Sequence, residues 1–314
     1  MKIAILMDDL KQINNLYDST LALIDGFKKR GCQIFYFTAD DLSLTSNDLV
    51  IAKVQNVEDL DQEISLNLTE VDLILIRNDP PFDMKYITCT YILEKIKDQV
   101  LILNDPSEIR NCPEKLLVMD FAKLMPKTLI TSDFKRAEEF YKNNGDTILK
   151  PLYAFGGDDV FLVKKDAKNF KSTFDLLISK QQMPIIIQQF IKKVDKGDKR
   201  ILLLNGNPVG CVNRIPKKGD IKSNLCAGGK MAKTSLTKQD QEICDIIGPI
   251  LRNKKLALVG IDVIDGYLSE INVTSPTGIV HFEELEGKDL RLKIVDEMID
   301  LAKNFSKKSL QVKN

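Results

Sequence analysis

The chain has 314 residues, of which 44% are apolar, and its 45 Lys and Arg balance 45 Asp and Glu. This length accommodates two domains or three small lobes, and the zero net charge argues against bulk binding of nucleic acid or a membrane surface. No apolar run approaches the roughly 20 residues that span a bilayer. The first residues, MKIAILMDD, turn acidic too early for a secretory signal, so we expect a cytoplasmic protein.

The cysteines and the histidine exclude some kinds of chemistry. The six cysteines are scattered and form no CxxC pair, which argues against a zinc site or a disulfide framework. We expect them to be reduced and mostly buried. His281 is the single histidine, so a His base paired with a Ser or Cys nucleophile has one candidate at most.

The first third of the chain alternates apolar strands with amphipathic helices. Strands are predicted at residues 2–7, 33–38, 71–77 and 100–104, and helices at 19–30 and 84–97. Asp18 or Ser19 can cap the first helix, and Gly31 ends it. The alternation predicts a doubly wound parallel sheet, in which ligands bind beyond the carboxyl ends of the strands. The segments at these ends are residues 8–19, 77–83 and 104–110.

After a helix near residues 113–123 the pattern changes to that of an α+β domain. Short strands at 147–150, 160–164 and 184–189 precede two hairpins, which turn at Asn205-Gly206 and Asp265-Gly266, and helices are predicted at 237–255 and 289–305. Between the hairpins, the polar loop 216–230 is long for a compact domain, which is typical of a lid. We predict a first domain over residues 1–122 and a second over 123–314, divided into a central lobe, 123–190, and a C-terminal lobe, 191–314.

The second hairpin carries Asp262, Glu270 and Asn272 around its turn. A two-residue turn at Asp265-Gly266 would pair Asp262 with Ser269 and place Glu270 on the other face, whereas a three-residue loop pairs Asp262 with Glu270. The second register also gathers a set of apolar residues on the opposite face: Val259, Ile261, Val263, Ile271 and Val273. A one-residue slip would scatter this set, so we predict the three-residue loop.

Two carboxylates and an amide oxygen on one sheet face are hard oxygen ligands. Magnesium takes such ligands, and triphosphate oxygens and water complete its coordination shell. The spacing D-x7-E-x-N is equally compatible with solvated acids on a polar sheet face. From the residues alone, both interpretations stay open.

A second group of signals follows the strand that ends at Lys150. Gly156 and Gly157 come next, and paired glycines between strands can fold backbone N–H groups over phosphates, although they more often make a simple turn. Lys115, early in a helix, is a second candidate cation for phosphates, although lysines there are more often solvated. Residues 188–191 either present backbone groups to an adenine edge or form an ordinary strand exit.

These elements occur in the order of the ATP-grasp fold, and several segments are more specific. They are RNDPPFD (77–83), NDPSEIRNCPEKL (104–116), ILKPLYAFGG (148–157), NLCAGG (224–229) and VGIDVIDGYLSEINVTSPTG (259–278). In these segments the chain resembles the bacterial glutathione synthetases, and the resemblance covers nearly its whole length. It implies a pre-ATP-grasp domain with a doubly wound parallel sheet, followed by a two-lobed ATP-grasp domain, an α/β plus α+β architecture.

The resemblance also implies ligands and residue roles. ATP and Mg²⁺, with Mn²⁺ as a tolerated substitute, would be the cofactors, and γ-glutamylcysteine and glycine the substrates. Asp262, Glu270 and Asn272 would bind the metal, and ATP would contact Lys115, Lys150, Gly156, Gly157, Gln188, Gln189, Ile191 and Asp198. Arg200, Arg214 and Lys222 would act on the reacting carboxylate, and Ser19, Arg77, Asn224, Gly228 and Gly229 would surround the dipeptide.

The implied reaction forms an acyl phosphate on the cysteinyl carboxylate, which glycine then attacks, so both nucleophiles belong to substrates. A homo-oligomer is implied, and neither nucleic acid nor a membrane is expected as a partner. The sequence departs from the family pattern at Asn78, Ala154, Lys222 and Val280. Two alternatives stay open: an ATP-grasp ligase for a different peptide, and a nucleotide-binding regulatory protein without catalysis.

Overall fold

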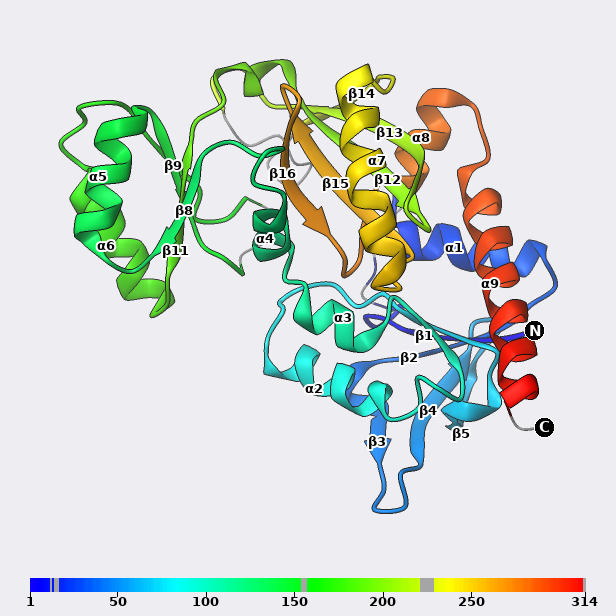
Figure 1. The fold of residues 1–314 in the computed structure, drawn as a ribbon. Helices are drawn as coiled ribbons and strands as arrows, with labels where there is room; N and C mark the ends of the chain where they lie inside the picture. Colours follow the sequence, from blue (N-terminus) through cyan, green and yellow to red (C-terminus); the bar gives the residue numbers. More distant parts are fainter. Residues whose placement is uncertain (12, 14–16, 154–156, 221–228, 313–314) are drawn as a thin grey trace.

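The computed structural model describes residues 1–11, 13, 17–153, 157–220 and 229–312. They form three units, each built on one sheet (Figure 1). The first domain has the seven-stranded sheet, the central lobe the four-stranded sheet and the C-terminal lobe the five-stranded sheet. The central lobe stands to one side, at the left of the view, whereas the C-terminal lobe shares buried cores with the first domain. None of the described helices is long and apolar enough to cross a membrane.

The first domain contains the predicted doubly wound parallel sheet. Its parallel strands, in the order β2-β1-β6-β7, are β1 (Lys2–Leu6), β2 (Gln33–Phe37), β6 (Leu73–Ile76) and β7 (Leu101–Leu103). The helices of this domain are α1 (Ser19–Lys29), α2 (Met84–Glu94) and α3 (Pro106–Asn111). The Asp18 carboxylate caps α1 by accepting a hydrogen bond from Leu21 N at 2.8 Å, and Gly31, at φ 68°, follows the helix end.

Three antiparallel strands extend this sheet, and the sequence pattern does not predict them. They are β3 (Leu42–Leu44), β4 (Val50–Asn56) and β5 (Asp59–Asn67), and β4 pairs antiparallel with β2. The sheet is therefore mixed at this edge. In β5, seven of nine residues are exposed. Such a strand has neither the apolar run nor the buried alternation by which strands are recognised in a sequence.

The central lobe is an antiparallel sheet with two covering helices. Its strands, in the order β10-β9-β11-β8, are β8 (Thr128–Thr131), β9 (Thr147–Lys150), β10 (Phe161–Val163) and β11 (Ile185–Gln189). The helices α5 (Phe134–Asn144) and α6 (Phe170–Gln181) pack on this sheet. Tyr141, Phe174 and Ile187 belong to a core that contains residues of this lobe alone. Because β9 ends at Lys150, this lobe delivers one of the predicted phosphate-binding lysines.

The C-terminal lobe is an antiparallel sheet between two layers of helices. Its strands, in the order β14-β13-β12-β15-β16, are β12 (Asp198–Leu204), β13 (Asn207–Ile215), β14 (Lys230–Lys233), β15 (Leu258–Ile264) and β16 (Tyr267–Asn272). Ile201 and Leu203 share a core with α7 (Lys238–Asn253), whereas Leu202 and Leu204 share another with α8 (Ile279–Glu286) and α9 (Leu290–Val312). Strand alternation thus buries both faces of the sheet. The last helix continues to Val312, beyond its predicted end at residue 305.

Short helices connect these units. They are α4 (Glu114–Leu117) with the 3₁₀ turn η3 (Val118–Phe121), and the 3₁₀ turns η1 (Ala39–Asp41), η2 (Leu68–Glu70) and η4 (Lys192–Lys196). The helix α4 packs against β16. This contact brings Lys115 to the hairpin that carries the predicted metal ligands.

The hairpin of β15 and β16 has the predicted pairing of acids. Asp262 lies directly opposite Glu270, and Gly260 opposite Asn272. The apolar set on the other face is buried as predicted: Val259, Ile261, Val263, Ile271 and Val273. The two carboxylates and the amide therefore share the face that is not packed in the core.

The predicted three-residue loop of this hairpin is wrong. Ile264 pairs with Tyr267 across a two-residue turn, in which Asp265 and Gly266 have φ of 49° and 79°. Positive φ at both positions is typical of a type I′ turn. The register shifts at Ser269, which has no partner on β15. This β-bulge shifts the register by one residue and so keeps the acids paired despite the shorter turn.

Candidate active site

Asp262, Glu270 and Asn272 lie on one face of the hairpin, the acidic face. Asp262 lies beside two arginines from other strands of the sheet, Arg200 on β12 and Arg214 on β13. Its carboxylate accepts hydrogen bonds from Arg200 Nε at 2.6 Å and Nη2 at 3.1 Å, and Arg214 Nη2 lies 2.9 Å from it. All three residues are buried. Burial alone would raise the pKa of Asp262, but Arg200 and Arg214 hold it well below its usual range. Asp262 is therefore an ionised anchor for both arginines.

Glu270 and Asn272 extend this face along the edge strand β16. Glu270 Oε1 lies 3.5 Å from Lys115 Nζ. Asn272 Nδ2 donates to Gly260 O at 3.2 Å and to Asp262 Oδ2 at 3.3 Å. The Asn272 amide oxygen accepts no hydrogen bond within the part of the chain that the structure describes. The amide is thus oriented by its nitrogen, and its oxygen is available to a cation.

These donors fit a magnesium ion that other oxygens complete. Among the residues described, no three His, Cys, Asp or Glu side chains gather as a metal-binding group. Glu270 and Asn272 offer one carboxylate and one amide oxygen, while the Asp262 carboxylate is shared with the arginines. Magnesium is usually bound by one or two carboxylates together with substrate phosphates. The donor set therefore suits an ion that is bound jointly with a nucleotide.

Two buried lysines approach the acidic face from different elements. Lys150 is the last residue of β9, and Lys115 lies in α4. Burial lowers the pKa of Lys150, and the Lys115 ammonium lowers it further, against the opposing effect of Glu270, Asp198 and Asp262. The lysines and acids thus form one charged cluster between the lobes. Two ammonium groups that repel each other in a partly desolvated site are stabilised by a polyanionic ligand such as a triphosphate.

Four other residues predicted to contact ATP lie near the end of β11 and the start of β12: Gln188, Gln189, Ile191 and Asp198. Gln188 Nε2 donates to Thr128 Oγ1 at 2.9 Å, and Asp198 Oδ2 accepts from Arg214 Nη2 at 2.6 Å. Gln189 and Ile191 are half-buried, and Gly157 has a positive φ of 79°. Gly156, Lys222, Asn224 and Gly228 lie outside the described residues, and Gly229 precedes β14. The nucleotide and substrate contacts of these residues stay predictions.

Ser19 and Arg77 are buried where the first domain meets the loop after β16. Ser19 Oγ accepts from Gly278 N at 3.1 Å and from Ile279 N at 3.3 Å. Arg77 Nη1 donates to Pro276 O at 3.2 Å, and burial lowers the pKa of its guanidinium. Both side chains therefore join the two units in this structure. Their predicted contact with the dipeptide stays a prediction.

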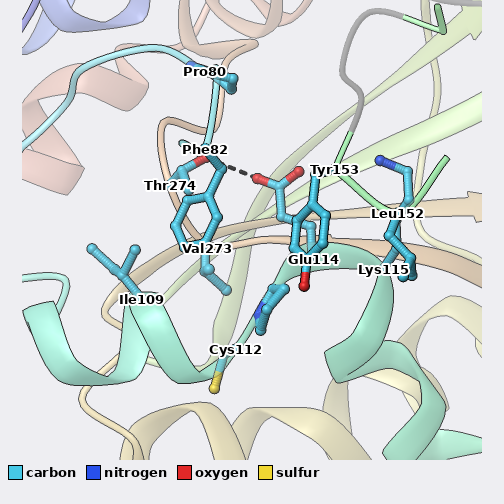
Figure 2. A pocket seen from close by; sticks show the side chains of 11 residues that line it. Pro80, Phe82, Ile109, Cys112, Glu114, Lys115, Leu152, Tyr153, Val273 and Thr274 are labelled. Carbon is cyan, nitrogen blue, oxygen red and sulfur yellow. Dashed lines mark hydrogen bonds between the residues drawn. The ribbon is translucent and has the colours of Figure 1, made fainter. Parts of the chain in front are cut away.

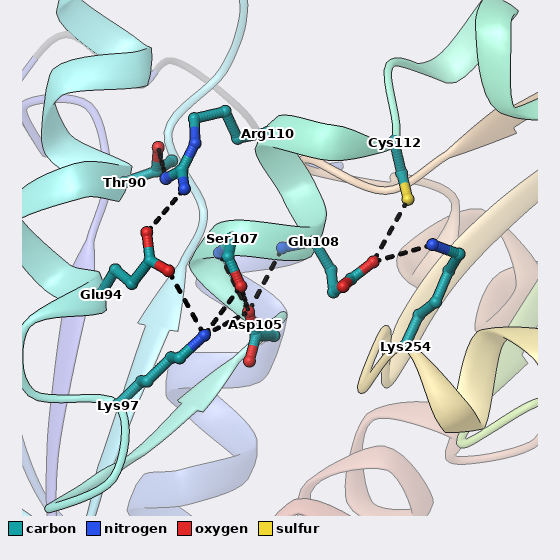
Figure 3. A network of polar contacts seen from close by, with 9 residues as sticks. All are labelled: Thr90, Glu94, Lys97, Asp105, Ser107, Glu108, Arg110, Cys112 and Lys254. Carbon is teal, nitrogen blue, oxygen red and sulfur yellow. Dashed lines mark hydrogen bonds and ion pairs between the residues drawn. The ribbon is translucent and has the colours of Figure 1, made fainter.

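A polar network fixes the helix that leads to Lys115 (Figure 3). Arg110 Nη2 binds Glu94 Oε2 at 2.6 Å, and Arg110 Nη1 donates to Thr90 Oγ1 at 3.1 Å. Lys254 Nζ, just beyond α7, binds Glu108 Oε2 at 2.9 Å. These contacts tie α3 to α2 on one side and to the C-terminal lobe on the other. The segment that precedes α4 is thereby held in place.

A pocket beside the acidic face contains a carboxylate that the predicted site does not include (Figure 2). Glu114 Oε1 accepts a hydrogen bond from Thr274 Oγ1 at 2.8 Å. Burial raises the pKa of Glu114, and the nearby Glu270 carboxylate raises it further. Sequence reasoning missed Glu114. The available signal was its position directly before Lys115 in the segment NDPSEIRNCPEKL.

Comparisons with known proteins match both parts of this architecture. The family model of the prokaryotic glutathione synthetase N-terminal domain matches residues 1–110, and that of the prokaryotic glutathione synthetase ATP-grasp domain matches residues 114–287. The chain is 45% identical to a glutathione synthetase of Rhodopseudomonas palustris, over 94% of this chain and 97% of the relative. It is 43% identical to that of Mesorhizobium japonicum, over 92% of this chain and 95% of the relative.

Solved structures of lower identity share the fold. The D-cycloserine synthetase DcsG, at 11% identity, has a TM-score of 0.70 over 96% of this chain and 99% of its own. The ATP-grasp ligase PsnB, complexed with a precursor variant, Mg and ADP, has a TM-score of 0.63 at 16% identity, over 95% of this chain and 97% of its own. These likenesses show the ATP-grasp fold, and the closer relatives show an ATP-dependent ligase. The chain belongs to the prokaryotic glutathione synthetase family.

Proposed function

We propose that this protein joins γ-glutamylcysteine to glycine with hydrolysis of ATP to ADP and phosphate, which produces glutathione. The observation that carries this proposal is the pairing of Asp262 with Glu270 on a hairpin face that also receives Lys115 and Lys150. A cluster of this kind suits a magnesium–triphosphate. Family membership supports the dipeptide and glycine as the substrates.

The proposed site residues act on charge that develops during phosphoryl transfer. Lys115 and Lys150 hold the phosphates, and Glu270 and Asn272 hold Mg²⁺, with Mn²⁺ as a possible substitute. When bound, the ion neutralises charge on the transferring phosphoryl group. The cysteinyl carboxylate attacks the γ-phosphorus, and the glycine amine then displaces phosphate from the acyl phosphate. The protein contributes position and positive charge, because both nucleophiles belong to substrates.

Arg200 and Arg214 are proposed to stabilise the oxyanion that forms when glycine attacks. Both guanidinium groups are held by the Asp262 carboxylate. Cations that are oriented before the reaction stabilise developing charge without reorganising. Asp262 stays among the proposed metal ligands, because a carboxylate has lone pairs for a cation as well as for an arginine.

The remaining assignments rest on the family. We propose that Gly156, Gly157, Gln188, Gln189, Ile191 and Asp198 contact ATP, and that Ser19, Arg77, Asn224, Gly228 and Gly229 surround the dipeptide. We propose that Lys222 acts with Arg200 and Arg214 on the developing oxyanion. We also propose a boundary near residue 122 between the first domain and the ATP-grasp domain, a cytoplasmic location and a homo-oligomer.

The proposed reaction is tested by ADP release with single omissions. The complete mixture of ATP, Mg²⁺, γ-glutamylcysteine and glycine is expected to release ADP, and removal of the dipeptide or of glycine to abolish net product formation. ADP release with another peptide in place of the dipeptide would identify the protein as a ligase for that peptide. ADP release that ignores γ-glutamylcysteine would contradict the proposed substrate, and ATP binding without hydrolysis under every combination would indicate a regulatory protein.

A further inference from the structure

The pocket of Figure 2 has an apolar wall, two aromatic rings and one carboxylate, and the Lys115 ammonium and the Thr274 hydroxyl also line it. Its apolar lining comes from four segments of the chain: Pro80, Ile109, Cys112, Pro113, Leu152 and Val273. The rings are those of Phe82 and Tyr153, and the carboxylate is that of Glu114. Neither phosphoryl transfer nor metal binding, as derived above, uses these three side chains.

The Glu114 carboxylate lacks a full set of donors. Thr274 Oγ1 donates to Oε1 at 2.8 Å, and no other hydrogen bond to this carboxylate comes from the described part of the chain. Tyr86, whose ring centroid is 5.0 Å from that of Phe82, has a buried hydroxyl with no hydrogen-bond partner among the described residues. Lys115 and Arg200 contribute positive charge near the Glu114 carboxylate, but a buried carboxylate with one hydrogen-bond donor still gains from further donors. The pocket thus has room for a ligand group that donates hydrogen bonds.

The two rings favour a cationic donor. Phe82 comes from the first domain and Tyr153 from the central lobe, and their ring centroids are 6.4 Å apart with an interplanar angle of 12°. Tyr153 is 40% exposed. Aromatic faces carry negative potential and attract ammonium groups, more strongly where water is excluded. Two ring faces together with one carboxylate therefore favour an ammonium over a neutral amide or hydroxyl.

The pocket adjoins the reacting centre. Lys115 lines it and is paired with Glu270, and Thr274 follows Asn272 by two residues. Both proposed substrates carry an ammonium, glycine on its α-carbon and γ-glutamylcysteine on its glutamyl head. On the basis of the proposed function, we propose that Glu114, Phe82 and Tyr153 form a binding subsite for the ammonium group of one of these substrates.

The variant Glu114→Gln tests the subsite without removing its contact to Thr274, because the amide oxygen of Gln still accepts that hydrogen bond. Loss of one charge-assisted contact is expected to raise the KM of a single substrate by about tenfold. The KM of the other substrate is expected to stay within about twofold. Unchanged KM values for both substrates would overturn the subsite, as would a parallel rise in both.

Substrate analogues without the ammonium decide which substrate is bound. Hydroxylamine is largely uncharged at neutral pH and traps acyl phosphates as hydroxamates. If the subsite binds glycine, wild type and Glu114→Gln form hydroxamate from the dipeptide equally well. If it binds the glutamyl head, the two proteins differ with γ-glutamylcysteine but use glutaryl-cysteine, which lacks the amino group, equally well. A variant that is weaker by the same factor with every analogue has a structural defect, which overturns the proposal.

Matched variants distinguish the effects of the Tyr153 ring and of the Glu114 charge from a general loss of protein stability. Tyr153→Phe keeps the ring and is expected to behave as wild type, whereas Tyr153→Leu is expected to raise the same KM as Glu114→Gln. Glu283→Gln removes a partly buried carboxylate on α8 that contacts Arg291 rather than the pocket, and it is expected to leave both KM values unchanged. If the wild-type protein shows no turnover that depends on the dipeptide, the proposed function is wrong, and the proposed subsite is wrong as well. If the wild-type protein makes glutathione and the Glu114→Gln variant is unaffected, only the proposed subsite is wrong.

Discussion

At the scale of single residues, the acids of the hairpin have different environments although they share one face. Asp262 is enclosed by Arg200 and Arg214, whereas the Glu270 side chain is 24% exposed and faces Lys115. An enclosed carboxylate orients its partners, and an accessible one is free to bind an incoming cation. A substitution at Glu270 can therefore distinguish a role in metal binding from a role in stabilising the fold.

Replacing Glu270 with Gln is expected to lower turnover at least about a hundredfold, because the charge that is proposed to bind Mg²⁺ is lost. The thermal unfolding midpoint is expected to change little, since the side chain is partly exposed and lies outside the core. ADP release at several magnesium concentrations, with calorimetry on the same samples, measures both effects. Glu284→Gln, an exposed position on α8, is the control. Near-normal activity of the Glu270 variant would remove it from the metal site.

His281 provides a pH prediction, because it is the single histidine and its ring stacks on that of Tyr17 at 4.5 Å. Burial lowers its pKa below the ordinary 6.5, against an opposing effect of Glu284. The unfolded chain therefore binds a proton at higher pH than the folded chain. Stability from this group is fully present above about pH 6.5 and is lost as the pH falls through the lowered pKa.

Two measurements check this prediction. The imidazole resonances are expected to titrate with a midpoint below 6.5 in the native protein. In His281→Gln, the free energy of unfolding is expected to fall less steeply between about pH 6.5 and pH 5 than in wild type. A native midpoint above 6.5 would show that Glu284 outweighs burial.

At the scale of elements, one side chain of the first domain clamps both strands of the hairpin. Asn104, which is buried, donates through Nδ2 to Leu258 O at 2.9 Å and to Val273 O at 2.7 Å. Its Oδ1 accepts from Leu258 N at 2.9 Å. The start of β15 and the residue after Asn272 are thereby held by one amide. The positions of the hairpin's acids relative to Lys115 depend on this clamp.

Replacing Asn104 with Leu leaves three buried backbone groups without their partner, and the expected loss in the free energy of unfolding is about 3 kcal/mol. We expect the folded variant to need more Mg²⁺ for half-maximal activity, because Glu270 and Asn272 of β16 are less well fixed. Urea denaturation and magnesium titration measure these effects. Asn144→Leu removes a single local bond to Phe140 O and should cost less than about 1 kcal/mol. An unchanged magnesium requirement in the Asn104 variant would limit the clamp to a stabilising role.

The hairpin also shows how far sequence can predict this site. Its apolar alternation determines which residues face the core, and this correctly pairs Asp262 with Glu270. The same pairing is compatible with a longer loop or with a bulge, and local pattern does not distinguish a bulge at Ser269. The enclosure of Asp262 by arginines depends on strand order, because Arg200 and Arg214 come from two other strands. Tertiary contacts of this kind, like the exposed strand β5, leave no periodic signal.

At the scale of the whole molecule, two of the hydrophobic cores join residues from both sides of residue 122. One core contains residues of the first domain together with residues of the C-terminal lobe, such as Leu6 and Leu203. The central lobe has a core of its own, which includes Phe174 and Leu149. Shared cores unfold together, whereas a separate core allows independent opening. The central lobe is therefore the unit expected to move relative to a single body formed by the other two.

Native-state hydrogen exchange in paired core variants tests this division. Phe174→Ala is expected to reduce protection of the amides of β9 and β11 by about 3 to 5 kcal/mol, because it removes a buried ring from the central core. Amides of β1 and β12 should keep their protection, since their cores contain no residue from the strands or helices of that lobe. Leu203→Ala, in the shared core, is expected to reduce protection in β1 and β12 together. If Phe174→Ala lowers protection throughout the chain, the three units unfold as one. The central lobe would then not move as a separate body, and any closure around a nucleotide would require bending within the lobes.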